Sequence, residues 1–354
     1  MLLFIACAGL LGQADFAKVD RWLEQYTPQM GGRSVLMVYK EGKIVYSRSV
    51  NDRSAIQRWF DKRVATREDD DQSAEDYTPD TKQLIASCSK WYSAALVMTF
   101  VDEGSLSLSD TVGKYLPILS AHGKGNITLD ECLSHLTAIK APSLRKSMNE
   151  MKEWSSMQDA IDKIAVLPME GQPGKIFRYS HVGLQIAAAV IEHISGKSFE
   201  QLFAERIATP LDMLHSDFGK GKVALPAGGG RSTTNDYMHF AEMILNKGLY
   251  NGKRILSEQS IATMQVNRIR QDVKIAYSPA EAGSFGYGYG EWVMETSSDG
   301  HETTAVTSPG LFGSFPWVDN KNQYCAFLLT FYLKNDGRHK KYLELKSLVE
   351  EALR

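Results

Sequence analysis

The chain has 354 residues, of which 43% are hydrophobic and 23% are charged, and its formal net charge at pH 7 is -2. These values are typical of a folded globular protein that is long enough for one large domain or two lobes. Because 40 basic residues are balanced by 42 acidic ones, the composition offers no basic surface of the kind that nucleic acids bind, and no nucleic-acid partner is expected.

Residues 1–14 are mostly apolar and are interpreted as the remnant of an export signal. The segment is short and lacks a basic start, so a segment packed on the body of the protein, or a misassigned start, is the alternative. Cys7 is also compatible with a lipoprotein processing site. The predicted location is therefore periplasmic or secreted, with the cytoplasm as the alternative. No other stretch is long and apolar enough to cross a bilayer, so no membrane span is predicted.

The next elements follow from periodicity and turn residues. Residues 15–26 have helical periodicity, and the β-rich runs 34–39 and 43–49 flank Glu41-Gly42, a pattern that is typical of a hairpin. Helices are then expected at 91–103, 129–136, 157–164, 182–194, 199–207, 234–246 and 257–266. Strands are expected at 287–296, 301–307, 313–318 and 323–332, and a last helix at 340–353. Strands at both ends with helices between them indicate one sheet built from both termini.

Several features argue against cofactor and metal sites. The cysteines Cys7, Cys88, Cys132 and Cys325 show no paired metal-ligand spacing, and the last three are expected to be small buried hydrophobes without disulfides. The acidic run 67–76 lacks the glycine turn and spaced ligands of a calcium loop, so a solvated loop is the preferred interpretation. Neither a metal nor an organic cofactor is expected.

Ser87-Cys88-Ser89-Lys90 stands where a turn-rich segment gives way to the apolar helical run 91–100. A serine and a lysine three positions apart at a helix start can both face one cleft. A serine hydroxyl is a poor nucleophile at neutral pH, whereas a desolvated amine of lowered pKa can take its proton as it attacks. The motif therefore predicts Ser87 as a nucleophile and Lys90 as its activating amine. Taken alone, it also fits a helix-start serine beside a surface lysine.

Two further motifs follow in order, Phe177-Arg178-Tyr179-Ser180-His181 and Ser308-Pro309-Gly310-Leu311-Phe312-Gly313. Taken together, these motifs resemble those of the penicillin-recognising serine hydrolases. The set comprises the nucleophile motif, the two motifs above, residues 103–110 (Glu-Gly-Ser-Leu-Ser-Leu-Ser-Asp) and residues 228–233 (Gly-Gly-Gly-Arg-Ser-Thr). In particular it resembles the branch of class C β-lactamases, D-alanyl-D-alanine carboxypeptidases and family VIII carboxylesterases. The resemblance runs from about the first strand to the last helix.

The resemblance implies an α+β fold of the β-lactamase/transpeptidase-like type. An antiparallel sheet would be flanked by the terminal helices, with a large, mainly helical lobe inserted and the active site in the groove between. We expect residues 15–84 and 282–354 to form the sheet lobe and residues 85–281 the helical lobe, together making one discontinuous catalytic unit.

The resemblance also assigns roles to individual residues. Tyr179 would share general acid/base work with Lys90, and a tyrosine beside a cation can have a lowered pKa. The backbone N–H groups of Ser87, at a helix start, and of Leu311, on a strand after the third motif, would form the oxyanion hole. The residues expected to bind substrate are His181, Ser308 and Gly310.

Two departures from the family pattern bear on the substrate. His181 replaces a common asparagine, and either lines the site or only packs against it. Ser308-Pro309-Gly310 replaces a motif that begins with lysine or histidine, a cation that helps the relatives to bind a carboxylate through a contact worth roughly 1.5–3 kcal/mol. His301, Arg178 and Arg231 are candidate replacements, with a solvent-facing histidine and surface salt bridges as the alternatives.

The sequence thus predicts a serine hydrolase that forms an acyl-enzyme on Ser87 and acts on small esters. The alternative within this class is a D-amino-acid peptidase or β-lactamase acting on amides like those of the cell wall. The alternative from a different class is a non-catalytic protein that binds peptidoglycan or a protein partner in the same groove. The oligomeric state is left open.

Overall fold

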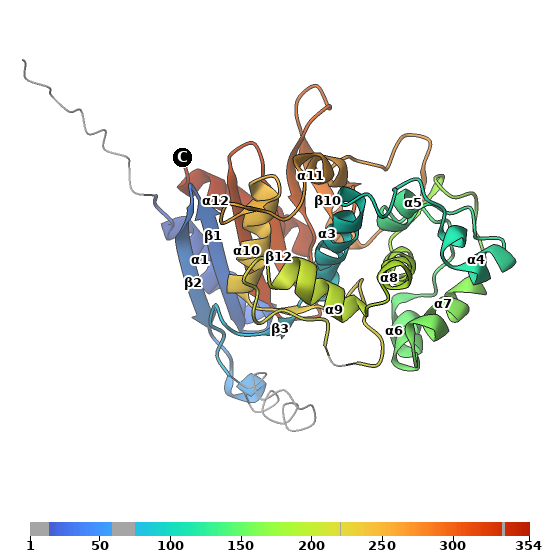
Figure 1. Ribbon diagram of the computed structural model, residues 1–354. Coiled ribbons are helices and arrows are strands. Elements are labelled where there is room, and N and C mark those ends of the chain that lie inside the picture. Colours follow the sequence, from blue (N-terminus) through green and yellow to red (C-terminus); the bar gives the residue numbers. More distant parts are fainter. Residues whose placement is uncertain (1–13, 59–74, 220, 335–336) are drawn as a thin grey trace, which may run out of the picture.

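The computed structural model describes residues 14–58, 75–219, 221–334 and 337–354. Within these residues a seven-stranded antiparallel sheet forms the frame of the protein, in the order β2-β1-β13-β12-β11-β10-β9 (Figure 1). Its strands are β1 (Arg33–Lys40), β2 (Lys43–Asn51), β9 (Gly286–Tyr287), β10 (Trp292–Thr296), β11 (Thr303–Thr307), β12 (Phe315–Asp319) and β13 (Tyr324–Thr330). Strands from both ends of the chain meet in one sheet, as predicted.

The first hairpin and the last strand join the two ends of the chain. β1 pairs with β13 from Ser34 opposite Thr330 to Lys40 opposite Tyr324. The turn between β1 and β2 is Glu41-Gly42, whose φ angles of 52° and 79° are both positive, as a tight two-residue hairpin turn requires. Every residue of β13 is buried, which explains why this strand is a continuous apolar run without alternation.

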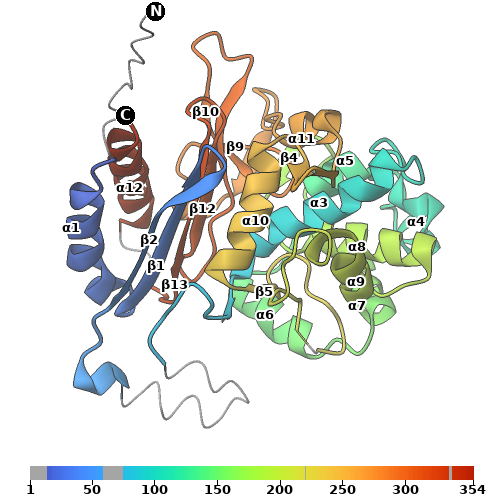
Figure 2. The same cartoon turned by 60° about the vertical axis from the view of Figure 1, so that its left-hand side comes forward.

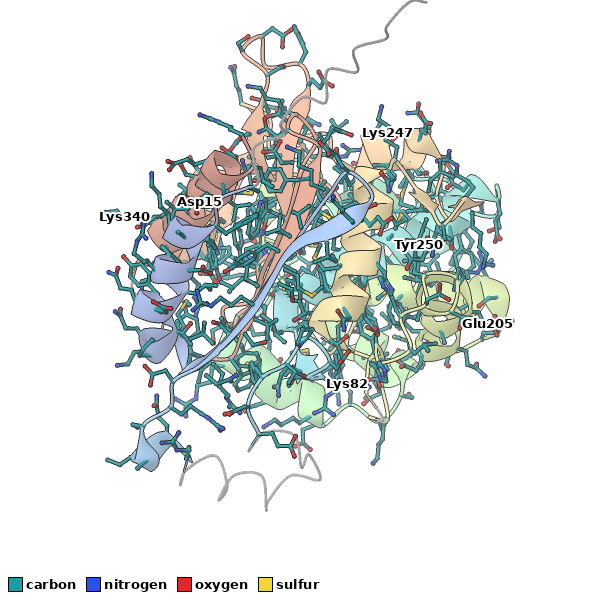
Figure 3. The ribbon with its side chains drawn as sticks, turned by 90° about the vertical axis from the view of Figure 1, so that its left-hand side faces the viewer. Asp15, Lys82, Glu205, Lys247, Tyr250 and Lys340 are labelled. Atoms are coloured by element: carbon teal, nitrogen blue, oxygen red, sulfur yellow. The ribbon has the colours of Figure 1, made fainter. Side chains whose placement is uncertain are left out.

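Helices cover both faces of the sheet (Figure 2). The helices against it are α1 (Ala17–Tyr26), α12 (Arg338–Ala352), α3 (Ser89–Asp102) and α10 (Thr234–Leu245). α1 and α12 lie on one face, and α3 and α10 lie on the other. Figure 3 looks onto the edge strand β2, with Asp15 and Lys340 on the side of the terminal helices and Tyr250 on the opposite side. The terminal helices therefore flank the sheet as expected.

The described chain also contains further helices and short strands, most of them on the α10 side of the sheet (Figures 1 and 2). The helices are η1 (Thr27–Met30), η3 (Ala86–Cys88), η4 (Val112–Lys114), α4 (Pro117–Ala121), α5 (Leu129–Leu133), α6 (Leu144–Lys152), α7 (Met157–Ala165), α8 (Val182–Ser195), α9 (Phe199–Phe203), η5 (Ala204–Ala208), α11 (Glu258–Met264) and η6 (Ala280–Ala282). The short strands are β3 (Gln83–Leu84), β4 (Ile176–Arg178), β5 (Arg231–Ser232), β6 (Leu249–Tyr250), β7 (Lys253–Arg254) and β8 (Lys274–Tyr277).

Some elements differ from the sequence prediction. The predicted helix 199–207 is divided into α9 and the π-helical turn η5. The predicted helix 129–136 ends at Leu133, and His135 just beyond it has a φ of 59°, which no helix contains. α6 and β8 were not predicted; β8 is a strand because it pairs with β4, about a hundred residues earlier. The division of the chain into two lobes stays a prediction.

Cys88, Cys132 and Cys325 are free and buried, as predicted. Almost all of the predicted signal remnant 1–14, including Cys7, and most of the acidic run 67–76 lie outside the described residues. The predicted location therefore stays a prediction. Among the residues that the structure describes, none of the helices combines the length and the apolar character that a bilayer span requires.

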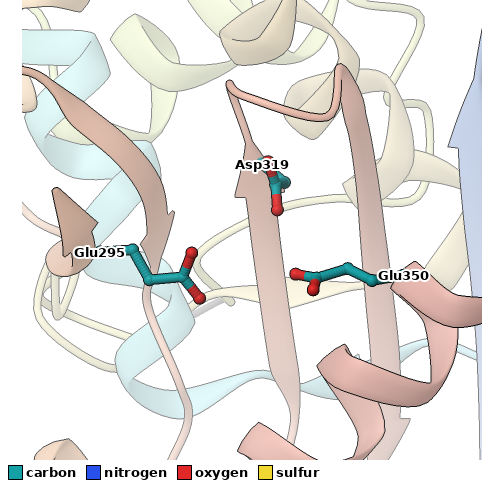
Figure 4. Close-up of side chains that lie close together, drawn as sticks. All are labelled: Glu295, Asp319 and Glu350. Atoms are coloured by element: carbon teal, nitrogen blue, oxygen red, sulfur yellow. The ribbon is translucent and has the colours of Figure 1, made fainter. Parts of the chain in front are cut away.

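Three carboxylates from different elements converge at the end of the sheet beside α12. Figure 4 shows Glu295 of β10, Asp319 of β12 and Glu350 of α12 pointing toward one another. Lys346, which is only 2% exposed, donates to Glu295 at 2.9 Å, to Asp319 at 3.0 Å and also to Glu350. Because this one ammonium forms an ion pair with each of the three carboxylates, we interpret the cluster as an ion-pair network that attaches α12 to β10 and β12.

Candidate active site

Ser87 and Lys90 face each other at the start of α3. Ser87 lies in the 3-10 turn η3, and Lys90 is in the first turn of α3. Lys90 Nζ donates to Ser87 Oγ at 3.0 Å and to the carbonyl oxygen of Ala227 at 2.6 Å. Ala86, directly before the serine, has a φ of 47°, a strained conformation of the kind that collects at functional sites. The structure therefore brings the predicted nucleophile and amine into direct contact.

The environment of Lys90 favours its neutral form. The side chain is only 4% exposed, and burial lowers the pKa of Lys90 to about 7. Desolvation penalises the ammonium because water no longer stabilises its charge. Near neutral pH a large fraction of Lys90 is thus a free amine, which can accept the proton of the Ser87 hydroxyl that it contacts.

Tyr179 follows β4 and lies over the lysine. Its ring centroid is 4.5 Å from Lys90 Nζ, and the ring packs against Trp292 at 5.1 Å and His135 at 4.7 Å between centroids. Burial raises the pKa of Tyr179 above its ordinary value, and interaction with the Ser87 side chain offsets only part of this effect. The expectation of a lowered pKa is therefore wrong, because desolvation outweighs the hydrogen bond with Ser87, and the phenol is protonated in the resting site.

His181 directly precedes α8 and is close enough to Lys90 to interact with its charge. Its ring centroid is 5.8 Å from that of Trp154. Burial, together with the charge of Lys90, lowers the pKa of His181 to about 4. The imidazole is therefore neutral at pH 7, where it can donate one hydrogen bond and accept another but offers no positive charge.

His135 is a site residue that the sequence analysis missed. It is buried, has positive φ and lies against the rings of Tyr179 and Tyr287, with centroids 4.7 and 4.8 Å away. Burial lowers the pKa of His135, and the charges of Lys90 and His181 add to this effect. It lies outside the three motifs that the sequence analysis used, so only the folded chain reveals its contact with Tyr179.

The third motif lies directly behind the nucleophile. Ser308 Oγ donates to the carbonyl oxygen of Gly290 at 2.9 Å and lies 3.3 Å from the carbonyl oxygen of Ser87. Gly310 is so close to Ile85 that a Cβ on it would stand 2.5 Å from the Ile85 carbonyl oxygen, which explains the glycine. Leu311 was expected on a strand but lies in the turn between β11 and β12, because β11 ends at Thr307.

The three candidate replacements for the missing cation have other positions or partners. His301 is exposed and lies before β11, at the opposite end of that strand from Ser308. Arg178 forms a two-pronged ion pair with Glu170, with Nη2 to Oε2 at 2.6 Å. Arg231 lies in β5, where it pairs with Leu84.

A cation that the sequence analysis missed does reach the turn after the third motif. Arg338, the first residue of α12, donates from Nη1 to the carbonyl oxygen of Leu311 at 2.8 Å. It is almost completely buried. Its position near the far end of the chain gave no local signal of this contact.

The sequence matches the model of a known family. The beta-lactamase family model matches residues 19–349, almost the whole chain. The chain belongs to the beta-lactamase family. Its β-lactamase/transpeptidase-like fold and its resemblance to the penicillin-recognising hydrolases are thereby confirmed.

Similar proteins within this fold carry different activities in their names. A solved protein of Bacteroides dorei DSM 17855, named as a candidate beta-lactamase, is 27% identical with a TM-score of 0.80 over 96% of this chain and 99% of its own. A family VIII carboxylesterase is 20% identical with a TM-score of 0.72 over 94% and 97%. The D-alanyl-D-alanine-carboxypeptidase/endopeptidase AmpH of Escherichia coli K12 is 22% identical over 62% of this chain and 63% of AmpH. Esterases and peptidases thus share the fold.

Proposed function

We propose that the protein is a serine hydrolase that forms an acyl-enzyme on Ser87 and hydrolyses small esters. The observation that carries the proposal is the hydrogen bond from Lys90 Nζ to Ser87 Oγ at 3.0 Å, made by a buried amine with a pKa of about 7. A hydroxyl paired with an amine that titrates near neutral pH is the arrangement expected of an activated nucleophile.

In the proposed acylation, Ser87 Oγ attacks the ester carbonyl carbon while its proton passes to neutral Lys90. The carbonyl oxygen becomes an oxyanion that accepts hydrogen bonds from the backbone N–H groups of Ser87 and Leu311. When the bond to the alkoxide breaks, the leaving oxygen takes a proton from Tyr179, whose phenol regains one from protonated Lys90.

Deacylation repeats these steps with water. Water attacks the acyl carbon, gives its proton to Lys90 through Tyr179, and forms a second oxyanion in the same hole. Ser87 Oγ then leaves with the proton, so that the carboxylic acid is released and the resting site is restored.

The choice of an ester rests on the electrostatics around the third motif. Ser308 stands where a cation is common in the relatives, and its hydroxyl is directed at backbone carbonyls. His181 is neutral at pH 7, because burial lowers its pKa to about 4. Arg178 is paired with Glu170. A substrate without a carboxylate would lose nothing from these changes, whereas a penicillin or a peptide C-terminus would lose a charge-assisted contact.

Two other functions are kept as outcomes of the test. A D-amino-acid peptidase or β-lactamase would use the same acyl-enzyme on an amide, and the name of AmpH keeps this candidate in view. A non-catalytic binder of peptidoglycan or of a protein partner would keep the groove without turnover. The buried amine of Lys90, which contacts Ser87 Oγ, argues against a non-catalytic binder, since binding alone gives no reason to bury Lys90.

The test is burst kinetics with p-nitrophenyl acetate and butyrate, run beside nitrocefin and a D-alanyl-D-alanine peptide. Wild type is compared with Ser87→Ala and with Ser93→Ala, which alters a buried serine of α3, six residues after Ser87, whose hydroxyl donates to the Pro226 carbonyl. We expect ester turnover and fluorophosphonate labelling in wild type and Ser93→Ala and neither in Ser87→Ala. If the peptide or nitrocefin is turned over faster than the esters, the protein is a peptidase or a β-lactamase rather than an esterase. If wild type is as inactive as Ser87→Ala on every substrate, the result favours the non-catalytic binder.

A further inference from the structure

Arg338 joins the turn between β11 and β12 to residues 332–334, just after β13. Its guanidinium donates to three backbone carbonyls, those of Leu311 at 2.8 Å, Tyr332 at 3.1 Å and Lys334 at 2.9 Å. The guanidinium carbon also lies 4.6 Å from the centroid of the Tyr332 ring. Only 1% of the residue is exposed, so this cation is directed entirely into the protein.

Such a buried cation is costly unless a specific arrangement needs it. Among the carboxylates of the described residues, Glu281 forms an ion pair with Arg338, and its Oε1 lies 3.8 Å from Nη1, a long distance for such a pair. Apolar side chains would hold a helix on a sheet at no such cost. α12 also has a separate ionic attachment in Lys346, two turns further along. The planar fork of arginine can serve several carbonyls at once, which suggests that the backbone around Leu311 is what the residue holds.

The Leu311 N–H lies between two fixed points of the backbone. On its N-terminal side, Gly310 is pressed against the Ile85 carbonyl just before the nucleophile turn. On its C-terminal side, Arg338 holds the Leu311 carbonyl. Tyr332 N donates to the Phe312 carbonyl at 3.0 Å, which connects the next residue of the turn to the segment just after β13. The Leu311 N–H belongs to the Gly310–Leu311 peptide, whose carbonyl accepts from Gly313 N at 3.0 Å. Both peptides that meet at Leu311 are thus held by hydrogen bonds.

We propose that Arg338 is a positioning residue that holds the Leu311 carbonyl and thereby keeps the preceding Gly310–Leu311 peptide in place, so that the Leu311 N–H remains directed at the oxyanion formed on Ser87. The inference rests on the proposed function, because it needs an acyl-transfer reaction with an oxyanion. Arg338 donates to backbone carbonyls rather than to Ser87. It acts through the backbone of the turn, and the preorganisation of an oxyanion donor matters most in the transition state.

The test measures transition-state stabilisation apart from folding. Arg338→Met and Arg338→Lys are assayed for kcat and KM on p-nitrophenyl butyrate and for inhibition by phenylboronic acid, which forms a tetrahedral adduct with a serine hydroxyl. For Arg338→Met we expect kcat and boronate affinity to fall together by about 10- to 100-fold, less than the 10²–10³ of a deleted donor, with KM little changed. Arg338→Lys, whose single ammonium cannot span three carbonyls, should lie between Arg338→Met and wild type.

Lys346→Met is the matched control, since it removes the other buried cation of α12 from a site on β10 and β12. It should lower Tm yet leave kcat and boronate affinity near those of wild type. If Arg338→Met does not fold, the kcat and boronate affinity of Arg338→Lys decide the matter. Wild-type kcat and boronate affinity in the folded Arg338 variants would reject the role of Arg338 but not the proposed function. The same would follow if Lys346→Met lowered kcat and boronate affinity as much as the Arg338 variants do. A wild type without ester turnover or Ser87 labelling would reject the proposed function, and this inference with it.

Discussion

Lys90 should determine how activity depends on pH. Because burial lowers its pKa to about 7, the neutral amine that accepts the Ser87 proton increases as the pH rises through that value. We expect kcat/KM to rise about tenfold between pH 6 and pH 8 and then level off, since this ratio reports the free enzyme. Lys90→Arg should lose both the activity and the rise, because a guanidinium stays protonated.

The control for this prediction is Lys124→Arg, which alters another buried lysine, one whose amine donates to the Ala165 carbonyl at 2.7 Å. This variant should retain the wild-type pH profile. A wild-type profile that is flat from pH 6 to pH 9 would show that the protonation of Lys90 does not limit acylation.

Removal of the Tyr179 hydroxyl group tests the proposed proton relay. Tyr179→Phe removes the phenol and keeps the ring that packs against Trp292 and His135. Loss of a positioned acid/base group should lower kcat by about 10²–10⁴ with a nearly unchanged Tm. Tyr287→Phe, in the same aromatic cluster, should keep its kcat, and equal kcat in the two variants would remove Tyr179 from the proton relay.

Residues of the site differ in how far the sequence could reveal them. The three-residue spacing of Ser87 and Lys90 nearly determines their contact, because it spans a single helical turn. Tyr179 could be placed only through its motif and a family resemblance. His135 and Arg338 could not be found, since each reaches the site through contacts made by the folded chain, and one of them comes from the last helix.

Among the elements, the turn after the third motif is held by a close approach that allows no side chain. A Cβ on Gly310 would stand 2.5 Å from the Ile85 carbonyl, whereas a Cβ on Gly228 would meet nothing within 4 Å. Gly310→Ala should therefore displace the turn and lower kcat by at least about tenfold, in the range of an impaired oxyanion donor. Gly228→Ala is the comparison variant and should keep wild-type kcat and Tm; an active Gly310→Ala would mean that the turn is free to move.

Elements whose order depends on local pattern were predicted well. The Glu41-Gly42 hairpin, the long helix before Gly196 and the last four sheet strands follow from turn residues and periodicity. β8 could not be predicted, because its four residues are ordered by pairing with β4 in a distant part of the chain. The π-helical turn at 204–208 continues a helical pattern, and nothing in that pattern distinguishes it from an α-helix.

At the scale of the whole molecule, the sheet unites the two ends of the chain, because β1 pairs with β13 across the whole helical region of the sequence. The distribution of strands along the sequence was sufficient to predict this arrangement. It did not predict what lies at the junction of sheet and helices. There Gly290 approaches so closely that a Cβ would stand 2.4 Å from the Lys90 carbonyl, and the next residue, Glu291, is completely buried.

Glu291 should make the stability of the protein depend on pH. Burial raises the pKa of its carboxyl well above the ordinary value, and the Trp91 indole offsets only part of this effect. The folded protein thus keeps a proton that the unfolded chain releases above about pH 4.5, so this group makes the protein less stable as the pH rises from there. Glu291→Gln should remove that penalty and raise Tm by about 2 °C or more at pH 8, with a smaller gain at pH 5. Thermal melts across this range, with the exposed Glu302→Gln as control, measure the difference; a gain that is the same at every pH would mean that Glu291 is not protonated in the folded state.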